Sequence, residues 1–113
     1  MESPNTLLAP AAFYILFALA SGDKHGYAIM REARAASDNG LDLGPATLYT
    51  TIQRLLDSGW IAEAESPEGA DSRRRYYALT KDGNATLEAE LKRMESIVKK
   101  SKALRLRSAR SES

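Results

Sequence analysis

The segment from Gly44 to Ile61, GPATLYTTIQRLLDSGWI, restricts the fold of this chain more than any other. Its opening Gly-Pro is typical of a helix start, because proline is preorganised for the first turn and lacks the amide that would be unpaired there. Gly59 follows in the position that glycine usually takes at the end of a helix. We therefore predict a helix from about Pro45 to Ser58.

This predicted helix has two different faces. On a helical wheel, the apolar residues that cluster on one side are Leu48, Ile52, Leu55 and Leu56. The opposite side carries Thr47, Thr50, Arg54 and Asp57, with Gln53 and Thr51 at its margins. Threonine hydroxyls can donate to phosphates or base edges, and an arginine can contact guanine or phosphate. The alternative is an ordinary exposed surface, which Asp57 favours because phosphate repels its charge.

Two further helices are predicted before this segment. The apolar run LLAPAAFYILFALA, residues 7–20, is shorter than the ~20 residues that a membrane span needs, and it contains Pro10. We therefore predict a buried helix from about Leu8 to Ala20 and no membrane segment. A second helix is predicted from about Gly26 to the Asn39-Gly40 pair, which ends its apolar periodicity.

A β-hairpin and a last helix are predicted after it. WIAEAE and RRYYALT are short alternating segments separated by the turn-rich SPEGADS. Thr80 is a suitable N-cap for a helix over residues 81–104. Apolar residues at spacings of four, three and four form a coiled-coil-like seam on that helix, namely Leu87, Leu91, Met94 and Val98. Residues 105–113 are predicted to be a basic, disordered tail.

Three helices, a hairpin and a fourth helix in this order predict a mainly α fold. We predict a winged helix-turn-helix domain over residues 1–80, followed by a dimerisation helix. In such a domain the third helix is the recognition element. Arg73, Arg74 and Arg75 follow the hairpin turn, from which a wing can reach the phosphate backbone or minor groove. Their alternative role is a solubilising turn, partly neutralised by Glu68 and Asp71.

The composition narrows the function further. With no cysteine and one histidine, His25, the chain of 113 residues can form neither a thiolate metal site nor a histidine cluster. We expect no metal, no cofactor and no enzymatic activity, and a cytoplasmic location. The formal charge of only +1 means that a patch, and not the whole surface, would meet an anionic partner. His25 invites a pH-switch hypothesis, whereas a plain turn residue is the simpler interpretation.

Three motifs resemble the PadR family of bacterial transcriptional regulators. They are HGYAI at the second helix, GPATLYTTIQRLLDSGWI at the third, and RRRYYALTKDG at the junction from wing to last helix. The single short C-terminal helix resembles the smaller subgroup of that family. The resemblance implies a homodimer that binds an inverted-repeat operator in double-stranded DNA, usually as a repressor. We expect release by a small effector, whose contact residues the sequence does not identify.

The resemblance and the helical wheel together give two sets of candidate residues. Those for DNA binding are Thr47, Tyr49, Thr50, Gln53, Arg54, Arg73, Arg74 and Arg75. Those for the dimer interface, on the last helix and the first, are Leu8, Phe13, Leu87, Leu91, Met94 and Val98. The chain departs from the family pattern at Thr50, where many members have proline, and at Trp60, where an aliphatic residue is usual. The alternative function is a protein-interaction module of the same fold.

Overall fold

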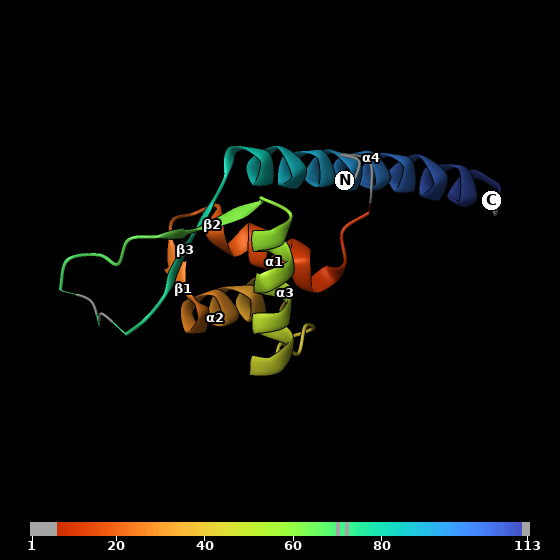
Figure 1. The fold of residues 1–113 in the computed structure, drawn as a ribbon. Coiled ribbons are helices and arrows are strands. Elements are labelled where there is room, and N and C mark those ends of the chain that lie inside the picture. Colours follow the sequence, from red (N-terminus) through yellow and green to blue (C-terminus); the bar gives the residue numbers. More distant parts are fainter. Residues whose placement is uncertain (1–6, 70, 72, 112–113) are drawn as a thin grey trace.

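The computed structural model describes residues 7–69, 71 and 73–111, with side chains up to residue 105. In order, the elements are α1 (Pro10–Leu19), β1 (Lys24–His25), α2 (Gly26–Ala36), α3 (Pro45–Asp57), β2 (Ile61–Ala64), β3 (Tyr76–Leu79) and α4 (Lys81–Ser111). Three helices pack beside a small sheet, and the long α4 runs across them and projects beyond (Figure 1). The predicted mainly α winged helix-turn-helix fold is confirmed.

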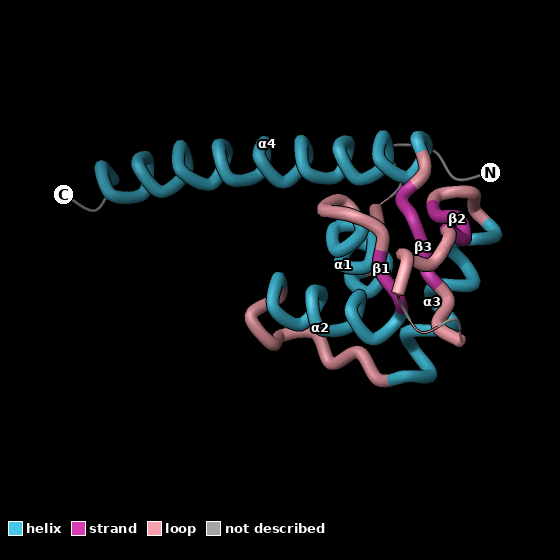
Figure 2. Tube along the Cα trace, turned by 90° about the vertical axis from the view of Figure 1, so that its left-hand side faces the viewer, coloured by secondary structure: helices cyan, strands magenta, loops and turns pink. Residues whose placement is uncertain are grey.

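The sheet has one strand more than the hairpin predicted from the sequence. Its order is β1-β3-β2, with all pairs antiparallel (Figure 2). In β1, Lys24 pairs with Tyr77 and His25 with Tyr76. The ammonium group of Lys24 also donates to the Ala18 carbonyl at 2.8 Å, which holds β1 against the end of α1. A strand of two residues is too short to show alternation, so periodicity could not reveal it.

The core lies where α1 meets α2, α3 and the sheet. Its largest fully buried side chains are Ile15, Leu16, Ile29, Leu43 and Ile61. Leu48, Ile52 and Leu55 of α3 are each 2% exposed, which confirms the predicted inward face of that helix. Burial of an aliphatic side chain of this size contributes roughly 1.5–3 kcal/mol. These three buried side chains therefore fix the rotation of α3 about its axis. They thereby determine which face of α3 is exposed.

Thr80 joins the end of the wing to the start of α4. Its hydroxyl accepts a hydrogen bond from the Gly83 amide at 3.0 Å, which confirms the predicted N-cap. The same hydroxyl donates to the Gly59 carbonyl at 2.7 Å. A Cβ atom at Gly83 would collide with the carbonyl oxygen of Trp60. Glycine is therefore required in the first turn of α4 by this close approach, although it weakens the helix locally.

The last helix is longer than predicted. It runs from Lys81 to Ser111 and gives the molecule an elongated outline of 64 × 30 × 24 Å. The sequence prediction ended the helix at residue 104 and made 105–113 disordered, whereas 105–111 are helical and 112–113 lie outside the described residues. That prediction relied on the end of the apolar seam. However, residues 105–111 contain three Arg, one Leu and one Ala, which favour helix, and have no Gly or Pro.

Candidate nucleic-acid interface

The outward face of α3 is exposed, as the helical wheel predicts. Thr47, Thr50, Gln53 and Arg54 are all exposed. The Gln53 side-chain amide donates to the carboxylate of Asp57 at 3.0 Å, so the one acidic group on this face is held by its neighbour. The Thr51 hydroxyl donates to the Thr47 carbonyl at 2.7 Å, so this hydroxyl is already bonded within α3. By its helical spacing, Thr50 lies near the centre of this face and Gln53 at its margin.

The candidate residues on the two flanks of α3 face different surroundings. Tyr49, on one flank, borders a cleft that it shares with the wing. Arg54 and Thr47, on the other flank, border a groove formed with the segment that leads into α1. The structure therefore brings Tyr49 together with the wing arginines and places Arg54 apart from them. The sequence could not separate the two groups, because the wheel shows only angles about one helix.

Tyr49 packs against the start of α2. A Cβ atom added at Gly26 would lie 2.7 Å from the Tyr49 hydroxyl, so the tyrosine approaches the bare backbone of α2 closely. The Tyr49 side chain remains 53% exposed. The hydroxyl end of the Tyr49 side chain therefore lies against the backbone of α2, which gives a structural reason for the glycine in HGYAI.

The cleft beside Tyr49 has a volume of about 290 Å³. It brings together residues from β1, α2, α3, the wing and β3, namely His25, Gly26, Tyr27, Tyr49, Arg73, Arg74, Arg75 and Tyr77. Three arginines and three tyrosines give it a basic lining rich in donors. Burial raises the pKa of Tyr77, so its hydroxyl remains protonated at neutral pH. Tyr27 and Tyr77 were not predicted to lie here, because contacts between residues far apart in the chain leave no local sequence pattern.

The three wing arginines have different partners. Arg73 donates to both carboxylate oxygens of Asp71, at 3.2 and 3.1 Å, and these bonds hold the pKa of Asp71 below its ordinary value. Arg75 forms an ion pair of 2.8 Å with Glu63 across the hairpin. Arg74 instead lies 3.0 Å from the His25 ring and forms no ion pair with a carboxylate in the described residues, although its charge also contributes to lowering the pKa of Asp71. Of the two carboxylates predicted to neutralise the wing arginines, Asp71 pairs with Arg73. The second carboxylate is Glu63, which pairs with Arg75, and not Glu68.

His25 contacts two hydrogen-bond donors, each of which needs an unprotonated ring nitrogen as its acceptor. Its Nδ1 atom accepts from the Ala28 amide at 3.3 Å, which caps α2, and its Nε2 atom faces Arg74. Arginine only donates, whereas a neutral imidazole has one acceptor nitrogen. Burial, followed by the charges of Arg74 and Arg31, lowers the pKa of His25. The imidazole is therefore uncharged at neutral pH, and only one of the two contacts is a full hydrogen bond at a time.

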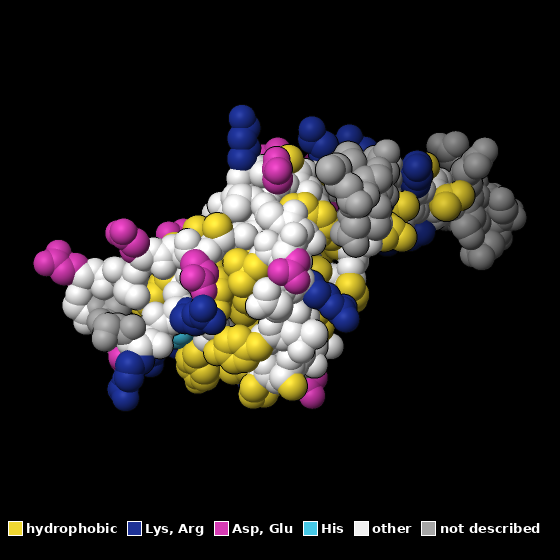
Figure 3. Space-filling view, in the orientation of Figure 1, with side chains coloured by type: hydrophobic (Ala, Val, Ile, Leu, Met, Phe, Trp, Pro, Cys, Tyr) yellow, Lys and Arg dark blue, Asp and Glu magenta, His cyan; other side chains and the backbone are white. Residues whose placement is uncertain are grey.

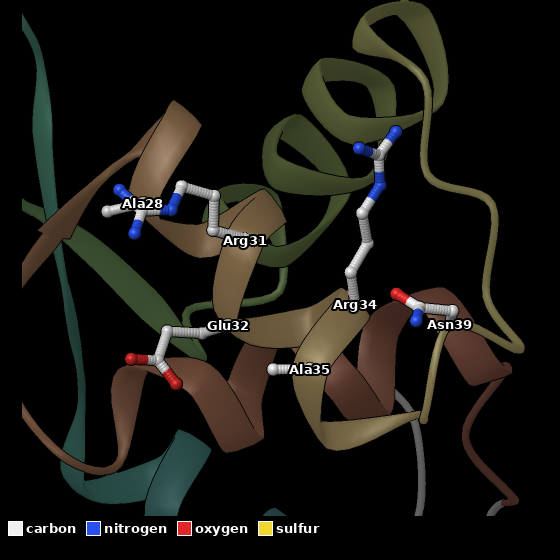
Figure 4. Close-up of a pocket in the computed structure, with 6 residues that line it drawn as sticks. All are labelled: Ala28, Arg31, Glu32, Arg34, Ala35 and Asn39. Atoms are coloured by element: carbon white, nitrogen blue, oxygen red, sulfur yellow. The ribbon is translucent and has the colours of Figure 1, made fainter.

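The exposed side of α2 adds further positive charge. Arg31 and Arg34 border a shallow hollow together with Glu32 and Asn39, and Arg34 extends toward the segment that leads into α3 (Figure 4). Arg34 lies 3.9 Å from Asp42, and the Arg31 guanidinium lies 5.9 Å from the Tyr27 ring centre. In helix-turn-helix proteins the helix before the recognition helix crosses the DNA backbone. Arg31 and Arg34 lie outside the buried face of α2, and the spacing of the apolar residues in the sequence already indicates this.

Comparison with known families decides the classification. The model of the family described as the transcriptional regulator PadR-like family matches residues 15–89. The chain belongs to this family. An uncharacterised protein from Lysinibacillus sphaericus is 34% identical over 74 residues, which is 65% of this chain and 67% of that protein.

Solved structures of regulators share the fold of this PadR-like protein. A transcriptional regulator from Clostridium thermocellum is 27% identical, with a TM-score of 0.65 over 82% of this chain and 87% of that one. A PadR family transcription regulator from Clostridium difficile is 24% identical, with a TM-score of 0.67 over 85% and 98% of the two chains. This PadR-like chain is therefore a transcription regulator, and regulators of its family generally bind DNA.

One apolar face of α4 in this PadR-like protein is exposed. Leu91, Met94 and Val98 are 36, 42 and 49% exposed and border a hollow with Lys99 and Lys102. Figure 3 shows basic side chains standing out from α4. Two other predicted interface residues differ, because Phe13 (8% exposed) and Leu87 (3%) are buried in the chain's own core. Leu8 is half-buried beside that core.

Among the described residues, no helix is both long and apolar enough to span a membrane.

Proposed function

We propose that this PadR-like regulator binds an inverted-repeat operator in double-stranded DNA as a homodimer. It acts as a cytoplasmic repressor that a small effector releases. The recognition helix α3 enters the major groove with Thr50 near the centre of its outward face, and the wing lies on the flanking backbone. No catalytic role is proposed. The main support for the proposal is the cleft that Tyr49 of α3 and Arg74 of the wing both line.

The cleft has the chemistry of a phosphate contact. Arg74 faces His25, which is an uncharged partner, whereas Arg73 and Arg75 face carboxylates. A phosphate is a better acceptor for Arg74 than an imidazole, since it carries a negative charge and can accept two parallel hydrogen bonds from a guanidinium. The Tyr49 hydroxyl supplies a second donor from α3. One DNA phosphate held between the two would fix the position of α3 relative to the groove.

The exposed face of α4 supports the dimer. Leu91, Met94 and Val98 continue the seam that Leu87 begins, and in the single chain their apolar surface lies in water. A second α4 packed against this face would bury it, as in a coiled coil. Two copies related by a two-fold axis would present two α3 helices to the DNA, which explains why an inverted repeat is the expected operator.

Selection of bound sequences from a random duplex pool tests this function. The expected result is a two-fold symmetric motif, with binding that weakens steeply as salt is added, because bound phosphates release counterions. The competing function is a module that binds another protein through α3 and the wing. Absence of any duplex binding, together with salt-insensitive binding to a protein partner, would overturn the proposal in favour of that module.

A further inference from the structure

A second hollow lies on the flank of α3 that faces away from the wing. It has a volume of about 380 Å³, within the usual size range of small-molecule sites. One wall is the segment that leads into α1 together with the first turn of that helix, with Leu8 and Ala12, and the other is α3, with Thr47 and Arg54. Trp60 also lines it. We call this hollow the α1–α3 groove.

The lining of the α1–α3 groove is mainly apolar, with three neutral hydroxyl side chains and one cation. Leu8, Ala12 and Trp60 contribute hydrocarbon or aromatic surface, and the Thr51 hydroxyl is already bonded to a backbone carbonyl of α3. Arg54 is the charged group. Within the described part of the chain, no carboxylate forms an ion pair with Arg54. The groove thus matches a molecule with an apolar body and one anionic end.

The two walls of the groove belong to parts of the protein with different roles. The Leu8 amide donates to Glu90 of α4 at 2.9 Å, and Glu90 is only 5% exposed. Arg93 pairs with the other oxygen of the same carboxylate at 3.0 Å. The wall that carries Leu8 is therefore tied to α4, while the opposite wall is the recognition helix itself. A molecule in the groove touches both.

We propose that the α1–α3 groove binds a small amphipathic carboxylate, whose anionic group pairs with Arg54 and whose apolar body lies against Leu8, Ala12 and Trp60. Such a ligand neutralises the one cation on this flank of α3, and it contacts the segment that Glu90 holds to α4. Bound there, it lowers the affinity for DNA. This last effect rests on the proposed function, whereas binding of the carboxylate does not.

Trp60 is the single tryptophan of the chain, so its fluorescence reports on the groove. Decanoate is the probe, and decan-1-ol, which has the same chain without the charge, is its control. We expect decanoate to change the Trp60 emission in a saturable way, and Arg54→Gln to weaken this binding at least tenfold. Decan-1-ol should bind more weakly and should not respond to Arg54→Gln. Arg105→Gln, a matched change at an exposed arginine of α4, should leave decanoate binding unchanged.

Three results would overturn the site. They are equal decanoate affinity in Arg54→Gln and the unchanged protein, equal affinity for decanoate and decan-1-ol, and Trp60 emission that changes on dilution without any ligand. The last would mean that a second copy of the chain occupies the groove. A circular dichroism spectrum confirms that Arg54→Gln is folded.

A DNA-binding measurement with decanoate tests the regulatory effect. Decanoate should weaken operator binding at least fivefold in the unchanged protein. Carboxylate binding that depends on Arg54 but leaves operator affinity unchanged would refute the regulatory effect. If the protein binds no duplex at all, the proposed function fails, while the fluorescence result still stands for or against the groove.

Discussion

The Nε2 atom of His25 lies 3.0 Å from a guanidinium nitrogen of Arg74 and so connects the start of α2 to the wing. The two residues are 49 positions apart in the chain. Tyr76 of β3 supports the imidazole from the side, with its ring centre 5.4 Å away in an edge-on arrangement. The basic cleft is therefore held by a contact whose strength depends on the protonation of one histidine.

The stability of the protein should fall between pH 7 and pH 5 because of His25. The pKa of His25 is lowered by burial, by Arg74 and by Arg31, so the folded state binds a proton less readily than the unfolded state. The stability that this difference contributes is present above the unfolded pKa, about 6.5, and is lost as the pH falls through the lower, folded value. Urea unfolding at the two pH values measures the loss.

His25→Asn is the matched variant for this experiment. Asparagine retains an oxygen that can cap α2 but does not titrate. The free energy of unfolding of this variant should change less between pH 7 and pH 5 than that of the unchanged protein. Asp71 does not disturb the comparison, because its lowered pKa places its effect at more acidic pH. An identical pH dependence in both proteins would contradict the assignment.

Arg74→Gln should weaken operator binding more than Arg75→Gln. Arg75 is already paired with Glu63, whereas Arg74 faces an uncharged imidazole. If Arg74 holds one phosphate, its loss should reduce affinity about equally across sequences and lower the salt dependence by about one counterion. Affinity measured over a salt series separates the two variants, and a larger loss for Arg75→Gln would count against the phosphate contact.

Gly83→Ala should destabilise the protein. Alanine favours a helix over glycine by roughly 0.8–1 kcal/mol, so propensity alone predicts the opposite sign. Because the added Cβ would collide with the Trp60 carbonyl, we expect a net loss of about 1–3 kcal/mol in the free energy of unfolding. Asn84→Ala, at an exposed neighbouring site, should change stability by about 0.5 kcal/mol or less. A stabilised Gly83→Ala protein would disprove the close approach.

Leu91→Asp should break the homodimer and with it the operator binding. The change places a charge in the apolar face that a second α4 would bury, which is costly without a partner charge. Sedimentation velocity gives the oligomeric state, and a gel-shift titration gives the affinity. Lys92→Ser, one residue along the helix, is the control and should remain dimeric. A Leu91→Asp protein that still sediments as a dimer would remove this face from the interface.

The sequence predicts those parts of the fold that local signals control. The bounds of α3 follow from Pro45 and Gly59, and its inward face follows from the apolar spacing. Strand β1 escaped prediction because Lys24 and His25 are ordered by partners more than 50 positions away in β3. The predicted end of α4 was too early. The end of an apolar seam indicates where the surface for a partner helix stops, and the helix itself can continue beyond it.

The candidate site was predictable in its composition but not in its arrangement. Tyr49 and the wing arginines could be named from the sequence, and they lie on one cleft. That Arg54 faces a different groove, and that Arg74 meets His25, depends on how separate elements pack. Such long-range contacts leave no trace in the pattern of a single segment.

The double hydrogen bond of Thr80 has a mechanical consequence. One hydroxyl fastens the carbonyl that follows α3 to the first turn of α4, and only this residue separates β3 from α4. There is no slack linker at this joint, so α4 acts as a stiff lever arm whose pivot lies at the end of α3. A rotation of that arm by a few degrees would therefore tilt the helix that we propose enters the major groove.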